Sequence, residues 1–387
     1  MLKKALSFLF FLLIFFSIKN YGQKMHSSKA KIPPAVNSNE ANKEQLVFAK
    51  AEGDSISNCI KWILSEAGNS AGQVRAGEYK ITYAITAPEG WYEYNNKEVN
   101  WVTPVNANAH FWIFIQDGAD GRIVSDLNIT ASVMNEKKEL VEQKPIPFAW
   151  MPLINGYGNN LQFSADGNYE FQLKILPPFY HRHDPYNGDR FTKMVTAVIP
   201  ISIRLKNIPA TPLSEKMEAQ TRLSKTTGDA YKNTLKEMFH QATDGKDTLS
   251  GDYFIAVADE YAEGHWFYKE NKFVYIIGNE QSAKQNAHVE VAVCDAKTGR
   301  FLHDLNVVVT LYKGDQKISM QKVPFMWHPW LYHYGLNSRV PAAGKDYRFM
   351  VHFDPPAYCR YGKNMGKQFT NPVDIEFDNL TIKTGQK

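Results

Sequence analysis

Histidines and one glutamate lie in the second half of the chain at spacings that suit a metal site. His288 and Glu290 stand two residues apart in an apolar run, so on a strand both side chains point to the same face. His328 and His333 follow in one aromatic loop, and His265 precedes them in a Gly-His-Trp turn. Imidazoles combined with one carboxylate are the ligand set of a borderline divalent ion such as copper, iron or zinc. This half of the chain therefore predicts a divalent-metal site.

The first half carries a different set of candidate ligands. His110 and Met151 stand at the positions that match His288 and His328. Trp112 and Gly156, however, stand where the second half has Glu290 and His333. The segment His181-Arg182-His183 occurs only in this half. A metal site needs three to four ligands, and neither half holds a full set alone. One site shared between the halves and two different sites are both open.

The same motifs recur along the chain, which indicates a tandem duplication. The recurring segments lie 177 or 178 residues apart: Asn108-Ala109-His110 with Asn286-Ala287-His288, Pro147 to Pro152 with Pro324 to Pro329, and Pro177-Pro178 with Pro355-Pro356. Further upstream, Gly53-Asp54 matches Gly228-Asp229 at 175 residues. A period this long means two complete modules joined head to tail, not a small solenoid repeat. Residues related by this offset are called counterparts below.

Each half has the same predicted order of elements, a helix followed by strands. Asp54 to Glu66 and Asp229 to Ala242 have helical spacing, and the first Asp of each is suited to cap a helix. The pattern then changes to period two. The predicted strands are Tyr79 to Ile85, His110 to Ile115, Asn128 to Val133, Tyr169 to Ile175, Tyr253 to Val257, His288 to Val293, Asn306 to Leu311 and Tyr347 to Phe353. Short alternating strands with Gly and Pro breaks predict a mainly β fold, an antiparallel β-sandwich in each module.

The ends of the chain predict export. Residues 1–23 have two lysines followed by an apolar run that is too short to span a membrane, which is the pattern of a signal peptide cleaved near residues 20–24. An uncleaved N-terminal anchor is the alternative. Residues 24–48 are rich in Ser, Asn, Lys and Pro and are expected to form a flexible tether. The first module is then predicted at 49–207, a linker at 208–222 and the second module at 223–384.

Charge and cysteine content narrow the function classes. Loss of the signal peptide removes three lysines, so the formal charge falls from +4 to +1. No basic stripe with interleaved aromatics is present, which argues against nucleic acid as a partner. Three cysteines are too few for a disulfide scaffold. Cys59 is expected in the core of the first helix, whereas Cys294 and Cys359 could be bonded, free or soft metal ligands.

Taken together, the motifs resemble those of the periplasmic accessory proteins of ferrous-iron uptake. The matching segments are His288-Val289-Glu290, Met151-Pro152, His333-Tyr334-Gly335, Gly167-Asn168-Tyr169, and Pro177-Pro178 with His181-Arg182-His183. The resemblance covers residues 110–205 and 288–382 and extends to a treponemal zinc-binding lipoprotein antigen. It implies immunoglobulin-like sandwich modules, a periplasmic protein that binds copper or another divalent ion, and an inner-membrane metal permease as a possible partner. Because the family forms dimers, it also implies an internal pseudo-dimer of the two modules.

Two other functions fit parts of the sequence. The aromatic loop from Phe325 to Tyr334 could bind a partner or a carbohydrate, or the same histidines could serve a metal-dependent enzyme with an open coordination position. No Gly-x-Ser-x-Gly or His-Glu-x-x-His motif is present, so an enzyme is the less favoured of these functions. His303 and Asp184 have no constellation of ligands around them and are expected at the surface.

Overall fold

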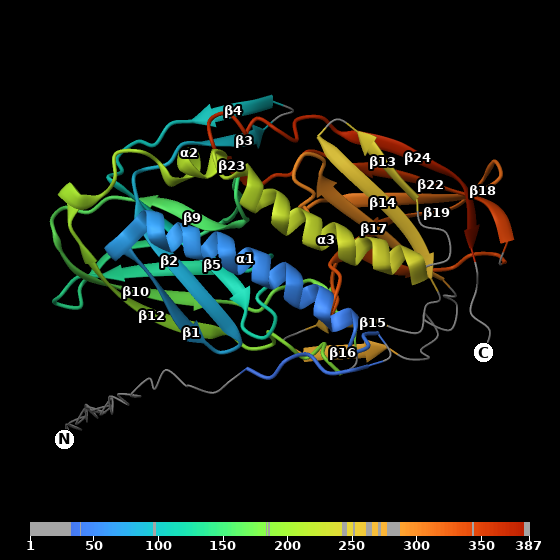
Figure 1. Cartoon of the computed structure of the whole chain (residues 1–387), viewed down its shortest axis with the longest axis horizontal. Helices are drawn as coiled ribbons and strands as arrows, with labels where there is room; N and C mark the ends of the chain where they lie inside the picture. The colour runs from blue at the N-terminus through green and yellow to red at the C-terminus, as the bar shows by residue number, and fades with distance from the viewer. Residues whose placement is uncertain are drawn as a thin grey trace, which may run out of the picture.

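The computed structural model describes residues 32–38, 40–95, 98–182, 184, 186–241, 246–250, 252–260, 265–269, 272–276, 287–342 and 344–382. The predicted signal peptide, residues 1–23, lies outside this part of the chain, as does the start of the predicted tether. Within these residues, strands are the most common regular structure, and they are arranged in four sheets (Figure 1).

Each half of the chain contributes most of one eight-stranded sheet and all of one four-stranded sheet. In spatial order, the strands of the first eight-stranded sheet are β1 (Ala71–Ala76), β2 (Tyr79–Thr86), β5 (Ala109–Asp117), β9 (Gly156–Leu161), β8 (Phe148–Trp150), β23 (Cys359–Tyr361), β3 (Trp91–Asn95) and β4 (Glu98–Val102). The four-stranded sheet of the same half contains β12 (Val195–Ile203), β10 (Gly167–Ile175), β6 (Ile129–Met134) and β7 (Leu140–Pro145). The strands of the second eight-stranded sheet are β13 (Lys246–Ser250), β14 (Tyr253–Glu260), β17 (Ala287–Asp295), β21 (His333–Ser338), β20 (Phe325–Trp327), β11 (His181–Arg182), β15 (His265–Lys269) and β16 (Lys272–Ile276). The four-stranded sheet of the second half contains β19 (Gln316–Val323), β18 (Val307–Lys313), β22 (Gly344–Phe353) and β24 (Val373–Ile382).

The strands β5 and β17 are central to the two eight-stranded sheets and are buried along their whole length. Side chains alternate between the two faces of a strand, so both faces of these strands must be covered. One face packs against the four-stranded sheet. In the first half, for example, the ring centroids of Phe111 on β5 and Phe171 on β10 lie 4.4 Å apart. The prediction of a mainly β protein built from antiparallel sandwiches is confirmed, and each of the eight predicted strands falls on an observed one.

The two halves exchange short strands. From the first half, β11 pairs parallel to β20 and antiparallel to β15 of the second half. From the second half, β23 pairs parallel to β8 and antiparallel to β3 of the first half. Each eight-stranded sheet therefore includes one strand from the other half, and without that strand the sheet would be interrupted. These two parallel pairs depart from the all-antiparallel arrangement that was predicted, because the exchanged strands enter from the opposite half.

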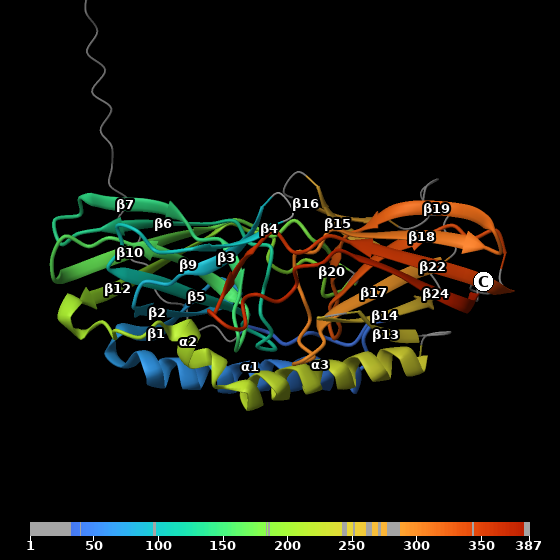
Figure 2. The same cartoon turned by 90° about the horizontal axis from the view of Figure 1, so that it is seen from above.

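Two long helices lie side by side along one side of the molecule, beneath both sandwiches (Figure 2). They are α1 (Gln45–Ala67) and α3 (Thr221–Gln241), and the short elements η1 (Gly68–Ser70), η2 (Leu205–Asn207) and α2 (Leu213–Glu218) flank them in sequence. Both helices are longer than predicted, and α1 includes residues 45–48 of the predicted tether. None of the helices in the described segments is long and apolar enough to cross a membrane.

The start of α1 explains why the tether prediction was wrong at its end. The side-chain oxygen of Asn42 accepts hydrogen bonds from the amides of Glu44 and Gln45, at 2.9 Å each. The Gln45 side chain in turn accepts one from the amide of Asn42 at 2.7 Å. This reciprocal arrangement is a capping box, which satisfies amides that the first turn leaves without partners. Asn42, and not Asp54, therefore caps the helix.

A glycine within each helix allows a close approach between the helix and the sandwich. A Cβ atom at Gly53 would lie 1.9 Å from the carbonyl oxygen of Asp120, and one at Gly228 would lie 1.9 Å from that of Thr298. Any other residue would force the helix away from the turn that follows the central strand. This contact accounts for the recurrence of glycine at both positions, even though glycine disfavours a helix interior.

Candidate metal centre

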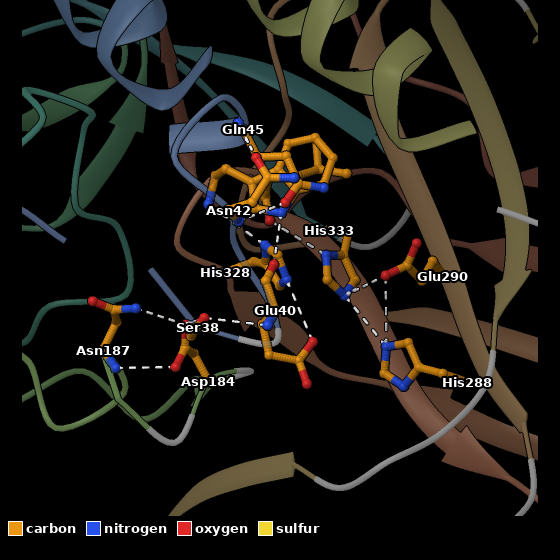
Figure 3. A network of polar contacts seen from close by, with 12 residues as sticks. Ser38, Glu40, Asn42, Gln45, Asp184, Asn187, His288, Glu290, His328 and His333 are labelled. Carbon is orange, nitrogen blue, oxygen red and sulfur yellow. Dashed lines mark hydrogen bonds and ion pairs between the residues drawn. The ribbon is translucent and has the colours of Figure 1, made fainter. Parts of the chain in front are cut away.

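The structure brings three of the predicted ligands into one buried cluster. His288 and Glu290 lie on β17 and His333 lies at the start of the adjacent strand β21, and these three residues are called the metal trio below (Figure 3). One ligand atom from each of the three lies within 4.8 Å of the others. The Nε2 atoms of His288 and His333 are 3.4 Å apart, and Glu290 Oε1 lies 3.8 Å and 3.3 Å from them. All three side chains are at most 4% exposed.

Hydrogen bonds on the far side of each ring direct the lone pairs toward the trio. His288 Nδ1 lies 2.7 Å from the side-chain oxygen of Asn337, so this nitrogen donates and carries the ring proton. His333 Nδ1 makes a longer contact, at 3.4 Å, with the carbonyl oxygen of Leu331. A neutral imidazole with a protonated Nδ1 presents its Nε2 lone pair. Metal-ligating histidines use the same arrangement, in which the other ring nitrogen donates to a carbonyl or carboxylate.

A glycine opposite Glu290 makes room for both rings. Gly335 pairs with Glu290 across the two strands. A Cβ atom there would lie 2.7 Å from His333 Cδ2 and 2.9 Å from His288 Nε2, closer than side chains normally pack. The space at the trio therefore depends on a residue without a side chain.

His328 lies beside the trio and is held by the first half of the chain. Its ring centroid is 5.9 Å from that of His333. The carbonyl oxygens of His328 and Pro329 each accept a 3.0 Å hydrogen bond from Arg122, whose guanidinium also forms a 3.0 Å ion pair with Asp120. Counterpart Arg300 donates in the same way to the carbonyl of Met151, at 2.8 Å. Each recurring Gly-Arg pair thus fixes the proline-aromatic loop of the opposite half.

The first-half candidates lie at the matching position of the other eight-stranded sheet. His110 Nδ1 is 2.8 Å from the side-chain oxygen of Asn160, as in the second half. Its ring, however, packs against Trp112 at 4.0 Å and against Tyr361 at 5.3 Å between centroids. Burial lowers the pKa of His110 to about 3, so the ring is neutral. Met151 is fully buried nearby, and its methyl group approaches Gly156. Aromatic rings fill the space that the carboxylate and second imidazole occupy in the second half.

The remaining candidates divide between the exchanged strands and residues outside the described part. His181 lies on β11, where it pairs with Met326, two residues before His328. His183 is outside the described residues, and only the backbone of His265 is described, at the start of β15. All three cysteines are free thiols. Cys359 lies on β23 in the first-half sheet, so the Cys294–Cys359 disulfide that the sequence left open does not form.

Sequence reasoning missed several residues that shape the site. Asn337, Gly335 and Arg122 each have a counterpart of the same type in the first half, and this recurrence was the signal that could have identified them. A fourth residue that shapes the site, Glu40, lies in the predicted tether, and no such recurrence identified it. Its carboxylate Oε2 is 3.9 Å from His328 Nε2.

Two expected surface residues are buried instead. His303 is packed by the rings of Phe301 and Phe325 at 4.9 Å and 5.4 Å, and burial lowers its pKa to about 3. Asp184 is buried because it accepts hydrogen bonds from the Ser38 hydroxyl and from the side chain and amide of Asn187.

No protein-family model matches the chain, and no curated protein matches it. Among solved structures, FetP from uropathogenic Escherichia coli strain F11 is 19% identical with a TM-score of 0.29, covering 35% of this chain and 93% of that one. A copper-bound variant of the same FetP is 18% identical, with a TM-score of 0.29 and coverages of 34% and 94%. A copper-bound variant of Campylobacter jejuni P19 is 14% identical, with the same TM-score and coverages. At these values the metal assignment rests on the geometry of the metal trio and not on the likeness.

Proposed function

We propose that this protein is an exported divalent-metal-binding protein, for copper, iron or zinc, that assists metal uptake in the periplasm. The convergence of three acceptors in the metal trio carries the proposal. Two Nε2 lone pairs and a carboxylate meet within 4.8 Å at a buried position. Buried polar groups cost free energy unless they are paired, and one cation bound among these three donors would pair all of them at once. Nitrogen and carboxylate donors together suit copper, iron and zinc.

His328 and the exchanged strand of the first half extend this ligand set. His183 lies outside the described residues, so its part in the proposal rests on its counterpart. That counterpart, Tyr361, crosses from the second half and packs its ring 5.3 Å from His110 and 4.6 Å from Trp112. The latter two residues occupy the positions of the His-x-Glu pair in the first half. By the same sequence correspondence, His183 stays a candidate ligand from the first half, and His181 lies on the exchanged strand β11.

The role in uptake follows from the same arrangement. A fixed site of neutral imidazoles and one carboxylate binds a divalent ion without a chemical step, and such a site can retain an ion and release it to a transporter. The resemblance of the motifs to iron-uptake accessory proteins supports an inner-membrane metal permease as the recipient. The internal pseudo-dimer, supported by the exchange of β11 and β23, keeps the shared ligands together.

The aromatic loop is less suited to binding a partner or a carbohydrate. Trp327, Trp330 and Tyr332 are each at most 2% exposed. Their surfaces are used to pack the loop against the rest of the protein.

Metal analysis of untagged protein tests the proposal. Wild-type protein should bind one equivalent of copper or zinc, measured by elemental mass spectrometry after dialysis against micromolar metal. His333→Ala should lose this equivalent because it removes one of the three converging donors. His352→Ala is the matched control, since His352 is a partly exposed imidazole paired with Asp374 and should leave binding unchanged. Equal metal content in all three proteins, or none in the wild type, would contradict the proposal.

A further inference from the structure

We propose that Glu40 supplies a second carboxylate to this metal centre, carried by a segment from outside both sandwiches. The segment, residues 36–44 without the undescribed residue 39, is called the N-terminal strap. The inference rests on the proposed metal-binding function. It adds that docking of the strap and binding of the ion strengthen each other.

The strap is anchored to the first half of the chain at its beginning. The amide of Val36 donates a 2.8 Å hydrogen bond to the Asn187 side chain, and the Asn187 side chain donates one of 3.0 Å back to the Val36 carbonyl. The hydroxyl of Ser38 donates a 2.5 Å hydrogen bond to Asp184. Both partners follow shortly after the exchanged strand β11. The strap is therefore fixed to the same loop that leads away from the second-half sheet.

The end of the strap is anchored to the second half. Trp330 Nε1 donates a 2.9 Å hydrogen bond to the carbonyl oxygen of Glu40. The rings of Phe48 and Trp330 pack at 6.2 Å, and Ala41 is fully buried. Because Trp330 belongs to the loop that carries His328, these contacts place the backbone of Glu40 beside that loop.

The Glu40 side chain points into the site (Figure 3). Its Oε2 lies 3.9 Å from His328 Nε2, and the carboxylate side chain is only 13% exposed. This separation is too long for a hydrogen bond, which spans about 2.7–3.2 Å. It does suit two donors on either side of an ion, since metal–nitrogen and metal–oxygen bonds are each about 2.0–2.2 Å. The amide of Trp330 donates a long hydrogen bond of 3.5 Å to His328 Nδ1.

Charge balance also favours a second carboxylate. The metal trio contributes neutral imidazoles and the single negative charge of Glu290, which is 3% exposed. A divalent cation in that position would leave one positive charge buried, and buried charges are costly unless they are paired. The nearby Arg122 is already paired with Asp120. Glu40, whose carboxylate lies beside His328, would add a second negative charge to the site.

A consequence is that the strap and the ion are thermodynamically linked. If Glu40 contacts the ion only when the strap is docked, the ion must favour the docked state, and the docked strap must favour the ion by the same factor. The strap leads directly into α1, so its position is also tied to the helix that crosses the molecule.

Copper(II) titration of the wild type and three variants tests the inference, with binding followed by quenching of tryptophan fluorescence and by visible absorption. Glu40→Gln keeps the shape of the side chain and should lower copper affinity roughly 10–100-fold with a shifted absorption band, the range typical when a supporting group of a metal site is lost. Glu44→Gln is the matched control, because it removes the same charge from an exposed position four residues away. It should bind as the wild type does. Ser38→Ala keeps the carboxylate but loosens the strap, so it should lower affinity without changing the band.

Hydrogen exchange of residues 36–44 gives an independent readout. Copper should slow exchange of the strap in the wild type and leave it unchanged in Glu40→Gln. Unfolding curves without metal show whether each variant remains folded. If Glu40→Gln binds copper with wild-type affinity and spectrum, the inference is overturned while the metal site stands. If the wild type itself binds no copper, the proposed function and this inference fail together.

Discussion

Substitution of Gly335 by alanine should disable the metal site without removing any ligand. The new methyl group would lie 2.7 Å from His333 Cδ2, 2.8 Å from His333 Nε2 and 2.9 Å from His288 Nε2. Ordinary contacts of a Cβ atom begin at about 3.4 Å, so both rings must move by roughly 0.5 Å or more. Metal–ligand bonds tolerate only about ±0.2 Å. The two nitrogens can therefore no longer converge on one ion.

The size of the effect follows from binding linkage. At a free metal concentration of one hundred times the dissociation constant, the wild type gains about 2.7 kcal/mol of stability. A hundredfold loss of affinity at the same metal concentration leaves RT ln 2, or about 0.4 kcal/mol. The metal-dependent stabilisation should thus fall by about 2.3 kcal/mol. Overpacking would add a metal-independent cost of about 1–3 kcal/mol.

Urea denaturation with and without copper separates the two terms. The difference between the two curves reports metal stabilisation, whereas the curve without metal reports overpacking. Gly158→Ala is the matched control, because Gly158 is the counterpart and a Cβ there would meet His110 Nε2 at 2.4 Å. It should lower stability but keep the metal-dependent gain. An undiminished gain in Gly335→Ala would refute the placement of the ion between the two rings.

Three further outcomes are expected. Ligating imidazoles must be neutral, so copper affinity should fall as the pH drops below about 6.5, which competition titrations at pH 5.5 and 7.5 will show. Burial raises the pKa of Glu52 from 4.5 to about 7, so the native state holds this proton more tightly than the unfolded chain does. The free energy of unfolding should therefore fall as the pH rises from 4.5 to 7. Glu52→Gln should remove up to about 3 kcal/mol of that fall, as measured by urea titrations at pH 5 and 8. Because β11 and β23 are exchanged, residues 45–207 and 208–382 expressed separately should lack a stable fold by circular dichroism; a cooperative transition in either half alone would count against this.

Periodicity predicted the strands because local alternation decides which residues face the core. His288 and Glu290 share a face by the same rule, and their place in one buried cluster with His333 follows from the pairing of β17 with β21. The exchanged strands could not be predicted in this way. They span two and three residues, too few to show a period, and their partners lie in the other half of the chain.

The helices and the strap were missed for different physical reasons. Gly53 and Gly228 resemble helix breaks in the sequence, but they are retained inside helices because a side chain would collide with the facing turn. Glu40 lies in a polar segment with no periodic pattern. Its position is set by contacts of the strap with Asp184, Asn187 and Trp330. These contacts join residues between 146 and 290 positions apart in sequence, beyond the reach of any local rule.

Crystals grown with copper or zinc would test the central claim most directly, through the anomalous scattering of the metal. The account predicts one strong anomalous peak about 2.0–2.2 Å from Nε2 of His288, Nε2 of His333 and a carboxylate oxygen of Glu290. A peak only at other histidines, with the metal trio in direct hydrogen-bonded contact and no metal density between its donors, would contradict it.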